Sequence, residues 1–305
     1  MKALAAFILR NCWTAALVAA LSAALFWLFP LFLIVSGATV ALVTLRQGAF
    51  EGARVMALAG AGAVALHMLA LGPPWPMLEA LLVIWLPVAL LAVVLRATVS
   101  LSRTLQVAAV LGLLGVLSFY LALGDPAVWW NEVLGQWEQR LATQMPVQDP
   151  DQNTLVQLLA LLKEWAPYLP GQATGGALLF ILASLLLGRW QQATLFNPGG
   201  FRAEFHGLRL GRPLAALMLA LAATALLSGW PLLVNIALVL GLIYTIQGLA
   251  LVHAMAYQRR WSPAWLLLFY VFLLVPLLSQ LVMALGVADA WADFRNRLRP
   301  PADQR

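Results

Sequence analysis

The chain has 305 residues, of which 63% are hydrophobic and only 10% are charged. Soluble domains carry roughly 25% charged residues, so a soluble globular protein is excluded. The formal net charge of +6 comes from basic residues in short gaps between long apolar runs. Such gaps are typical of loops retained in the cytoplasm and give no reason to expect a nucleic-acid partner. Backbone amides in a bilayer core must be bonded internally, so we expect the runs to be transmembrane helices in contact with the lipid bilayer.

The first apolar block covers about residues 12–45. At ~1.5 Å rise per residue it is too long for one crossing of a hydrocarbon core ~30 Å thick. Pro30 has no amide proton, so we expect two short helices that meet there. Lys2 and Arg10 precede the block as in a signal peptide, but apolar sequence continues past Pro30. The first helix is therefore expected to be retained.

The rest of the chain has further apolar segments, separated by proline-rich, glycine-rich or basic gaps. We expect membrane helices over about 55–71, 78–95, 104–123, 171–187, 213–228, 231–256 and 264–285. The fold class is thus all-α, a polytopic transmembrane helix bundle of eight or nine membrane segments. The predicted division is 1–123 for helices 1–5, 124–170 for an external segment, 171–288 for helices 6–9, and 289–305 for a polar tail.

The segment 124–170 differs from the other gaps because it has six acidic residues against Arg140 and Lys163. Asp125-Pro126 and Asp149-Pro150 are each a helix start signal, with an N-cap followed by proline. Apolar residues then recur at helical spacing in two stripes: Trp129, Val133, Trp137 and Leu141, then Leu155, Leu158, Leu159, Leu162 and Trp165. We expect an extracytoplasmic insertion of two amphipathic helices, lying on the membrane surface or folded over the bundle.

The basic gaps alternate with other gaps along the chain, which predicts the orientation. With the N-terminus in the cytoplasm, every strongly basic gap lies inside, together with twelve of the eighteen Lys and Arg residues, and the acidic segment 124–170 lies outside. Nine crossings would leave the arginines of the polar tail outside, including Arg295 and Arg297. Eight crossings with one re-entrant segment would avoid this. We favour nine, and the eight-crossing alternative stays open.

Motifs for catalysis or metal binding are absent from the sequence. It has no histidine pair four residues apart, no cysteine pair, no phosphate-binding glycine loop and no Gly-x-Ser-x-Gly elbow. His67, His206 and His253 lie in different segments, and Cys12 is the single cysteine. The carboxylates of 124–170 are explained by a solvated helix face. We therefore expect no enzyme, and no metal or other cofactor.

Polar side chains inside the membrane are costly, so they are the first candidates for a functional site. The candidates for lining an outward-facing cavity for a small solute are His67, Asn235, Tyr244, Gln247 and Gln280. The alternative is that each bonds to a neighbouring group within the bundle. The most basic gap, 189–212, could meet a cytosolic partner or anionic lipid, or its charge could serve orientation alone.

Ala15, Ala19 and Ala23 lie on one face of the first helix. Small residues four apart allow two helix backbones to approach closely in a membrane. This alanine ladder predicts a close helix contact, either with another membrane subunit or with another helix of the same chain.

Three stretches resemble the YybS-like family of bacterial polytopic membrane proteins, a group of unknown function. They are Pro30-Leu31-Phe32 with Thr44-Leu45-Arg46-Gln47-Gly48-Ala49, then Phe196-Asn197-Pro198-Gly199-Gly200-Phe201, and Gly286-Val287-Ala288-Asp289 with Asp293-Phe294-Arg295. That family is distantly similar to the S components of energy-coupling-factor vitamin transporters. The resemblance implies a bacterial inner (plasma) membrane protein and a coupling subunit docked on the alanine ladder. S components usually have six helices, and this sequence has no vitamin-binding signature.

Two functions are consistent with these features. The favoured hypothesis is a small-solute-binding or transport-related subunit without its own ATPase, because of the alanine ladder and the resemblance. The alternative is a non-transport membrane scaffold for envelope or membrane-protein assembly, which would bind through the external helices or the basic loops. An intramembrane enzyme would need a nucleophile and a base, and the sequence offers no such pair.

Overall fold

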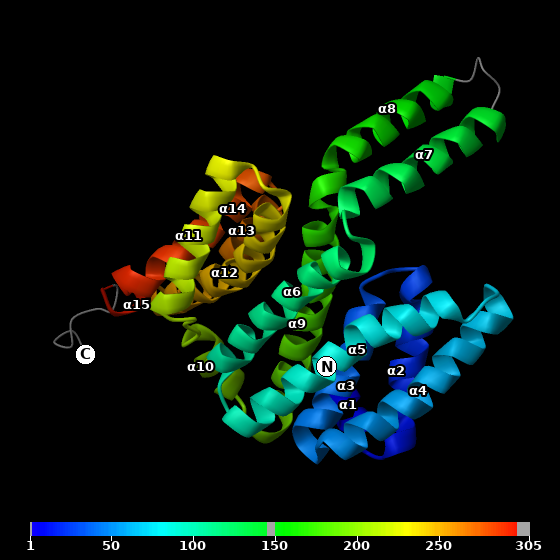
Figure 1. Cartoon of the computed structure of the whole chain (residues 1–305). Helices are drawn as coiled ribbons and strands as arrows, with labels where there is room; N and C mark the ends of the chain where they lie inside the picture. Colours follow the sequence, from blue (N-terminus) through cyan, green and yellow to red (C-terminus); the bar gives the residue numbers. More distant parts are fainter. Residues whose placement is uncertain (1, 145–149, 298–305) are drawn as a thin grey trace. The chain divides into compact units, whose positions relative to one another are not determined.

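The computed structural model describes residues 2–144 and 150–297, and this part of the chain is helical without any strand (Figure 1). The predicted all-α fold is confirmed. Asp149 and the tail residues 298–305 lie outside the described residues, and Leu141 is described by its backbone alone. The helical elements up to residue 123 are α1 (Lys2–Ile8), α2 (Cys12–Ala24), η1 (Leu25–Trp27), α3 (Phe32–Gln47), α4 (Ala49–Ala70), α5 (Trp75–Thr98) and α6 (Leu101–Leu123).

The remaining elements also follow the predicted order. The insertion forms α7 (Pro126–Gln144) and α8 (Pro150–Trp165), joined by η2 (Ala166–Tyr168) to the next segment. After it come α9 (Leu169–Phe196), α10 (Gly200–His206), α11 (Arg212–Ser228), α12 (Pro231–Gln258), α13 (Pro263–Phe272), α14 (Pro276–Ala292) and α15 (Phe294–Arg297).

Membrane segments can be counted by length and composition. Five described helices or helix runs are long and apolar enough to cross a membrane, or up to seven if each of two bent pairs is one span. The apolar helices α3 and α11 have 16 and 17 residues, fewer than the ~20 of a typical crossing. Each predicted segment has a helix or bent pair at its place, and the count of eight or nine is approximate.

The two bent pairs have local causes. The unpredicted helix α1 turns by 118° into α2, because Asn11 caps α2 by accepting from Thr14 N at 2.8 Å. The predicted last segment is broken at residues 273–275, and α13 and α14 are bent by 113°. Pro276 begins α14 after an extended Val275, since proline is favoured at the first helical position.

The chain packs as two compact units that do not follow sequence order. Unit 1 comprises 1–109, 177–215 and 242–305, and unit 2 comprises 110–176 and 216–241. The boundaries fall within α6, α9, α11 and α12. The sequence-based division at residues 123, 170 and 288 stays a prediction.

In unit 1 the alanine ladder is buried against the chain's own helices. Ala15, Ala19 and Ala23 are at most 1% exposed, and α2 packs on α3 and α4. Ser36 of α3 donates to Ala19 O at 2.8 Å. Contacts within the chain already cover this face, so the expected docking of a coupling subunit stays a prediction without an exposed ladder to support it.

Other small residues in unit 1 allow equally close helix crossings. A Cβ on Gly188 of α9 would lie 2.7 Å from Ala41 Cβ of α3. Where α12 meets α14, a Cβ on Gly286 would lie 2.8 Å from Gly248 N. Larger side chains would force these backbones apart, so the glycines fix both crossings.

In unit 2 the insertion is a helical hairpin, with α7 and α8 side by side (Figure 1). Leu134 and Leu159 are buried, and Lys163 of α8 forms an ion pair with Glu138 of α7. Trp137 and Trp165 of the predicted stripes are exposed, at 52% and 54%. The hairpin thus keeps a partly apolar outer face.

Candidate functional site

Asn235 is a fully buried polar node of unit 2. Its Oδ1 accepts from Gly171 N at 3.0 Å, and its Nδ2 donates to Tyr120 Oη and Pro167 O, each at 2.9 Å. One amide on α12 therefore bonds to α6, η2 and α9. Both polar atoms of the Asn235 amide thus bond to groups within the bundle. This agrees with the alternative that Asn235 has a packing role and does not line a solute cavity.

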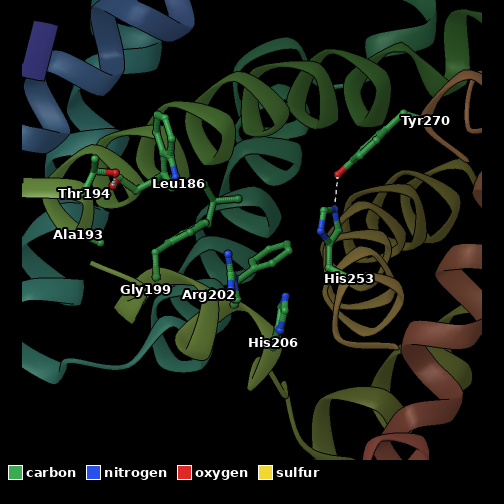
Figure 2. A pocket seen from close by; sticks show the side chains of 11 residues that line it. Leu186, Ala193, Thr194, Gly199, Arg202, His206, His253 and Tyr270 are labelled. Carbon is green, nitrogen blue, oxygen red and sulfur yellow. Dashed lines mark hydrogen bonds between the residues drawn. The ribbon is translucent and has the colours of Figure 1, made fainter. Parts of the chain in front are cut away.

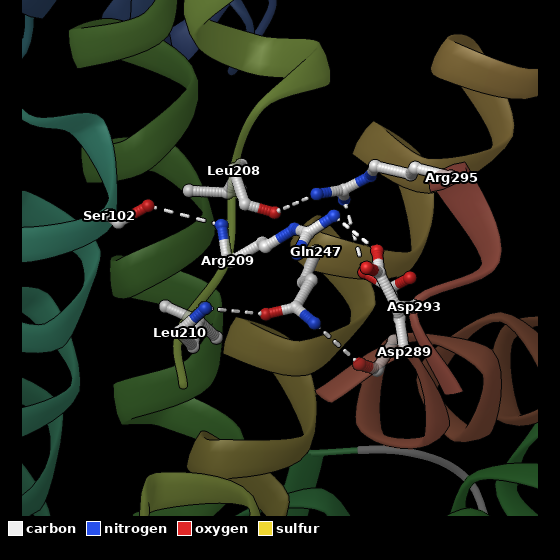
Figure 3. A network of polar contacts seen from close by, with 9 residues as sticks. Ser102, Leu208, Arg209, Leu210, Gln247, Asp289, Asp293 and Arg295 are labelled. Carbon is white, nitrogen blue, oxygen red and sulfur yellow. Dashed lines mark hydrogen bonds and ion pairs between the residues drawn. The ribbon is translucent and has the colours of Figure 1, made fainter. Parts of the chain in front are cut away.

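Gln247 has the same role in unit 1. It is 1% exposed, accepts from Leu210 N at 2.8 Å and donates to Gly286 O at 2.6 Å. Tyr244, one turn earlier on α12, is fully buried, and its hydroxyl has no hydrogen-bond partner among the described residues. Gln247 ties α12 to α14 and to the connection before α11 (Figure 3).

The remaining two predicted site residues lie elsewhere. His67 of α4 is 5% exposed, and its ring centroid lies 5.5 Å from that of Trp27. Gln280 of α14 is exposed. The structure thus brings Tyr244 and Gln247 together, but places Asn235 in the other unit. That these five residues line one solute site stays a prediction without a shared cavity to support it.

A polar network in unit 1 holds α14 and α15 (Figure 3). Arg295 is 5% exposed, donates to Leu208 O at 2.7 Å and lies 3.4 Å from Asp289, which is 2% exposed. Arg209 forms an ion pair with Asp293. Burial is the main cause that lowers the pKa of Arg295, and Asp289 opposes it. These bonds attach α14 and α15 to the basic gap 189–212.

The same gap forms one wall of a cavity of about 420 Å³ in unit 1 (Figure 2). The cavity lies among α9, α10, α12 and α13. Its lining residues are Leu186, Trp190, Ala193, Thr194, Gly199, Phe201, Arg202, Phe205, His206, His253 and Tyr270. Figure 2 shows Arg202, His206 and His253 around the same space.

Short distances connect the polar groups of this cavity. His253 Nε2 lies 2.7 Å from Tyr270 Oη, and the ring centroids of His206 and His253 are 6.5 Å apart. The Arg202 guanidinium lies over the Tyr257 ring, 4.9 Å from its centroid. Burial, followed by the charges of His253, Arg202 and Arg295, lowers the pKa of His206 to about 4. His206 is thus a neutral imidazole at pH 7.

Sequence reasoning missed this site. His206 and His253 are 47 positions apart by their numbering, and Arg202 looks like one more orienting charge. Only the course of α10 beside α12 brings them together. The described residues contain no group of three or more His, Cys, Asp or Glu that could hold a metal ion, so we assign none.

A multi-pass helical membrane protein is the class that the fold defines. Residues 168–290 match the model of a family described as a predicted membrane protein (DUF2232). This stretch includes every residue that lines the cavity. No curated protein and no solved structure matches the chain at a significant level.

Proposed function

We propose that this protein is a small-solute-binding or transport-related membrane subunit without its own ATPase. The cavity of Figure 2 carries this proposal, because its ~420 Å³ falls within the ~300–1,000 Å³ of small-molecule sites. Its aromatic walls and few polar groups are also typical of such sites. The YybS-like resemblance, with its distant similarity to S components, supports the same role in a bacterial inner membrane.

The site lies at the helix ends that carry the basic gaps, rather than at the predicted outer ends. Hydrogen bonds bring those gaps together in unit 1: Arg96 donates to Leu45 O at 2.9 Å, and Arg209 N donates to Ser102 Oγ at 3.0 Å. Because positive gaps face the cytoplasm, we place the cavity and the N-terminus on the cytoplasmic side. The hairpin α7–α8 is then extracytoplasmic.

A stability screen of the purified protein against small metabolites tests solute binding. The set contains equal numbers of anionic, cationic and neutral compounds. At least one compound is expected to raise the unfolding temperature, and Thr194→Phe, which fills the cavity, is expected to abolish the shift. Thr224→Phe is the matched control, because both threonines bond to a carbonyl four residues earlier at 2.8 Å, but Thr224 is exposed on α11. If no compound shifts the wild type, the solute-binding proposal fails.

One observation favours the alternative, a scaffold for envelope or membrane-protein assembly. The hairpin α7–α8 exposes Trp137 and Trp165, and exposed tryptophans are common anchors of protein interfaces.

Affinity purification from native membranes in mild detergent distinguishes the transport subunit from the scaffold. A transport subunit is expected to retain an ATPase and a coupling subunit after removal of residues 126–166. A scaffold is expected to retain assembly proteins and lose them with that deletion.

A further inference from the structure

The cavity of Figure 2 has one full positive charge, and the described residues that line it include no carboxylate. Arg202 is exposed and presents its guanidinium beside the imidazole of His206. Thr194 and Tyr270 add hydroxyl groups. A site with cationic and neutral donors, and without acidic groups, stabilises a negative charge.

The rest of the wall is flat and apolar. Phe201 and Phe205 are stacked, with ring centroids 5.7 Å apart, and Trp190 and Leu186 complete this side. Such surfaces favour the flat face of an aromatic or unsaturated group. The occupant is therefore an anion with a flat apolar body.

The imidazole of His206 adds a proton to this chemistry. It faces Arg202 on its own helix, His253 and Tyr257 on α12, and the charge of Arg295 from α15. Tyr270 of α13 bonds to His253. Burial and the positive neighbours lower the pKa of His206 to about 4 and keep the imidazole neutral at pH 7. An anion beside it would offset those positive charges and favour the imidazolium form.

On the basis of the solute-binding function above, we propose that the cavity takes a small organic anion with a flat apolar body. Arg202 pairs with its negative charge. His206 takes up one proton from the bulk solution as the anion enters and releases it to the solution when the anion leaves. The anionic group belongs to a free solute or to the headgroup of a lipid.

Calorimetric titration of the full chain in zwitterionic lipid nanodiscs tests this with two probes of the same shape. Benzenesulfonate stays charged between about pH 5 and about pH 8, and benzenesulfonamide stays neutral over the same range. The sulfonate is expected to bind at least about tenfold more tightly than the sulfonamide. Equal affinity for the two probes in the wild type overturns the proposal.

Variants separate the two roles. Arg202→Gln is expected to weaken sulfonate binding about tenfold, and Arg202→Lys to restore part of it. Arg259→Gln is the matched control, because Arg259 is exposed and outside the cavity lining. An unchanged affinity in Arg202→Gln contradicts the charge pairing.

The pH dependence tests the proton. An anion that raises the pKa of His206 above its free value of about 4 must bind more tightly as the pH falls from neutral toward that value. We expect affinity to rise several-fold from about pH 8 to about pH 5 and His206→Gln to abolish the rise. A wild type whose affinity is the same at both pH values, measured by the same titration, refutes the proton uptake.

Adding anionic phospholipid to the nanodiscs identifies the source of the charge. If a headgroup is the natural occupant, the lipid competes and weakens sulfonate binding; if a free solute is, the affinity is unchanged. The screen above keeps the two proposals apart. If only neutral or cationic compounds stabilise the protein, solute binding is supported and the proposal of an anionic occupant is refuted.

Discussion

Asn235 and Gln247 show how single amides fix the packing of this bundle. Each is buried and bonds through both of its polar atoms to separate parts of the chain. The cost of an unpaired polar group in a membrane explains why they are saturated. A polar group at membrane depth made both residues site candidates from the sequence. A residue that only holds helices together has the same property.

Replacing Asn235 by leucine should therefore destabilise the protein. The change removes the acceptor of Gly171 N and the donor to Pro167 O, and each interhelical bond in a membrane contributes about 0.6–2 kcal/mol. We expect a loss on the order of 2 kcal/mol in the free energy of unfolding in detergent or lipid. Gln280→Leu, at an exposed position, is the control without an effect. An unchanged stability in Asn235→Leu would show that these bonds do not hold the bundle.

His206 should make stability fall in acid. Its pKa is about 4 in the folded chain, below the ordinary value of 6.5, mainly because of burial and then because of His253 and Arg202. Between these two values the unfolded chain binds the extra proton, so stability decreases as the pH falls from about 6.5 toward about 4. Unfolding curves across this range should show a smaller decrease in His206→Gln than in the wild type. Identical pH profiles would contradict this role of His206.

At the scale of elements, α2 is defined by its small residues. The spacing of Ala15, Ala19 and Ala23 correctly predicts a close helix contact, but the residues alone do not say which helix is the partner. In the described structure the ladder is buried against α3 and α4 of the same chain. The exposed side of α2, with Trp13 and Leu17, is suited to lipid contact.

Ala19→Leu tests this packing. Ala19 has no exposed surface, so a larger side chain should separate α2 from α3 and cost about 1–3 kcal/mol of unfolding free energy. Ala57→Leu on α4 adds the same atoms at an exposed position and should leave stability unchanged. Thermal unfolding of the two variants compares them directly. If Ala19→Leu unfolds like Ala57→Leu, the ladder is not packed as described.

The bent pair α13–α14 is either one broken span or a re-entrant segment, and we propose the re-entrant form, which gives the eight-crossing alternative. With 10 residues, α13 is only about 15 Å long, too short to cross a bilayer. The bend of 113° turns α14 back. Arg295 then meets Leu208 O in the basic gap. We therefore expect both ends of the pair on the side of the basic gaps.

We accordingly expect the C-terminus in the cytoplasm, where Arg295 and Arg297 obey the positive-inside rule. A green fluorescent protein fused at residue 305 should be fluorescent, and an alkaline phosphatase fusion there should be inactive. The same reporters after Gly124, before the α7–α8 hairpin, should give the reverse result and serve as the internal control. An active phosphatase at the C-terminus would restore the nine-crossing arrangement.

At the scale of the whole molecule, the sequence predicts helices well and the site poorly. Apolar run length and the prolines at positions 30 and 126 locate the elements, because these are local effects. The bend between α13 and α14 and the turn between α1 and α2 depend on the backbone conformation of a few residues. The composition of a whole apolar segment does not describe that conformation. The cavity depends on which helices become neighbours, so Arg202, His206 and His253 carry no shared sequence signal.

The cavity beside α10 is the proposed site of a small solute. Native mass spectrometry of the protein, released from its own membranes without added ligand, tests it most directly. We expect a bound species of small-molecule or lipid mass on the wild type and on Thr224→Phe, and we expect it to be missing from Thr194→Phe. A wild type without any bound species, or equal occupancy in Thr194→Phe, would contradict it.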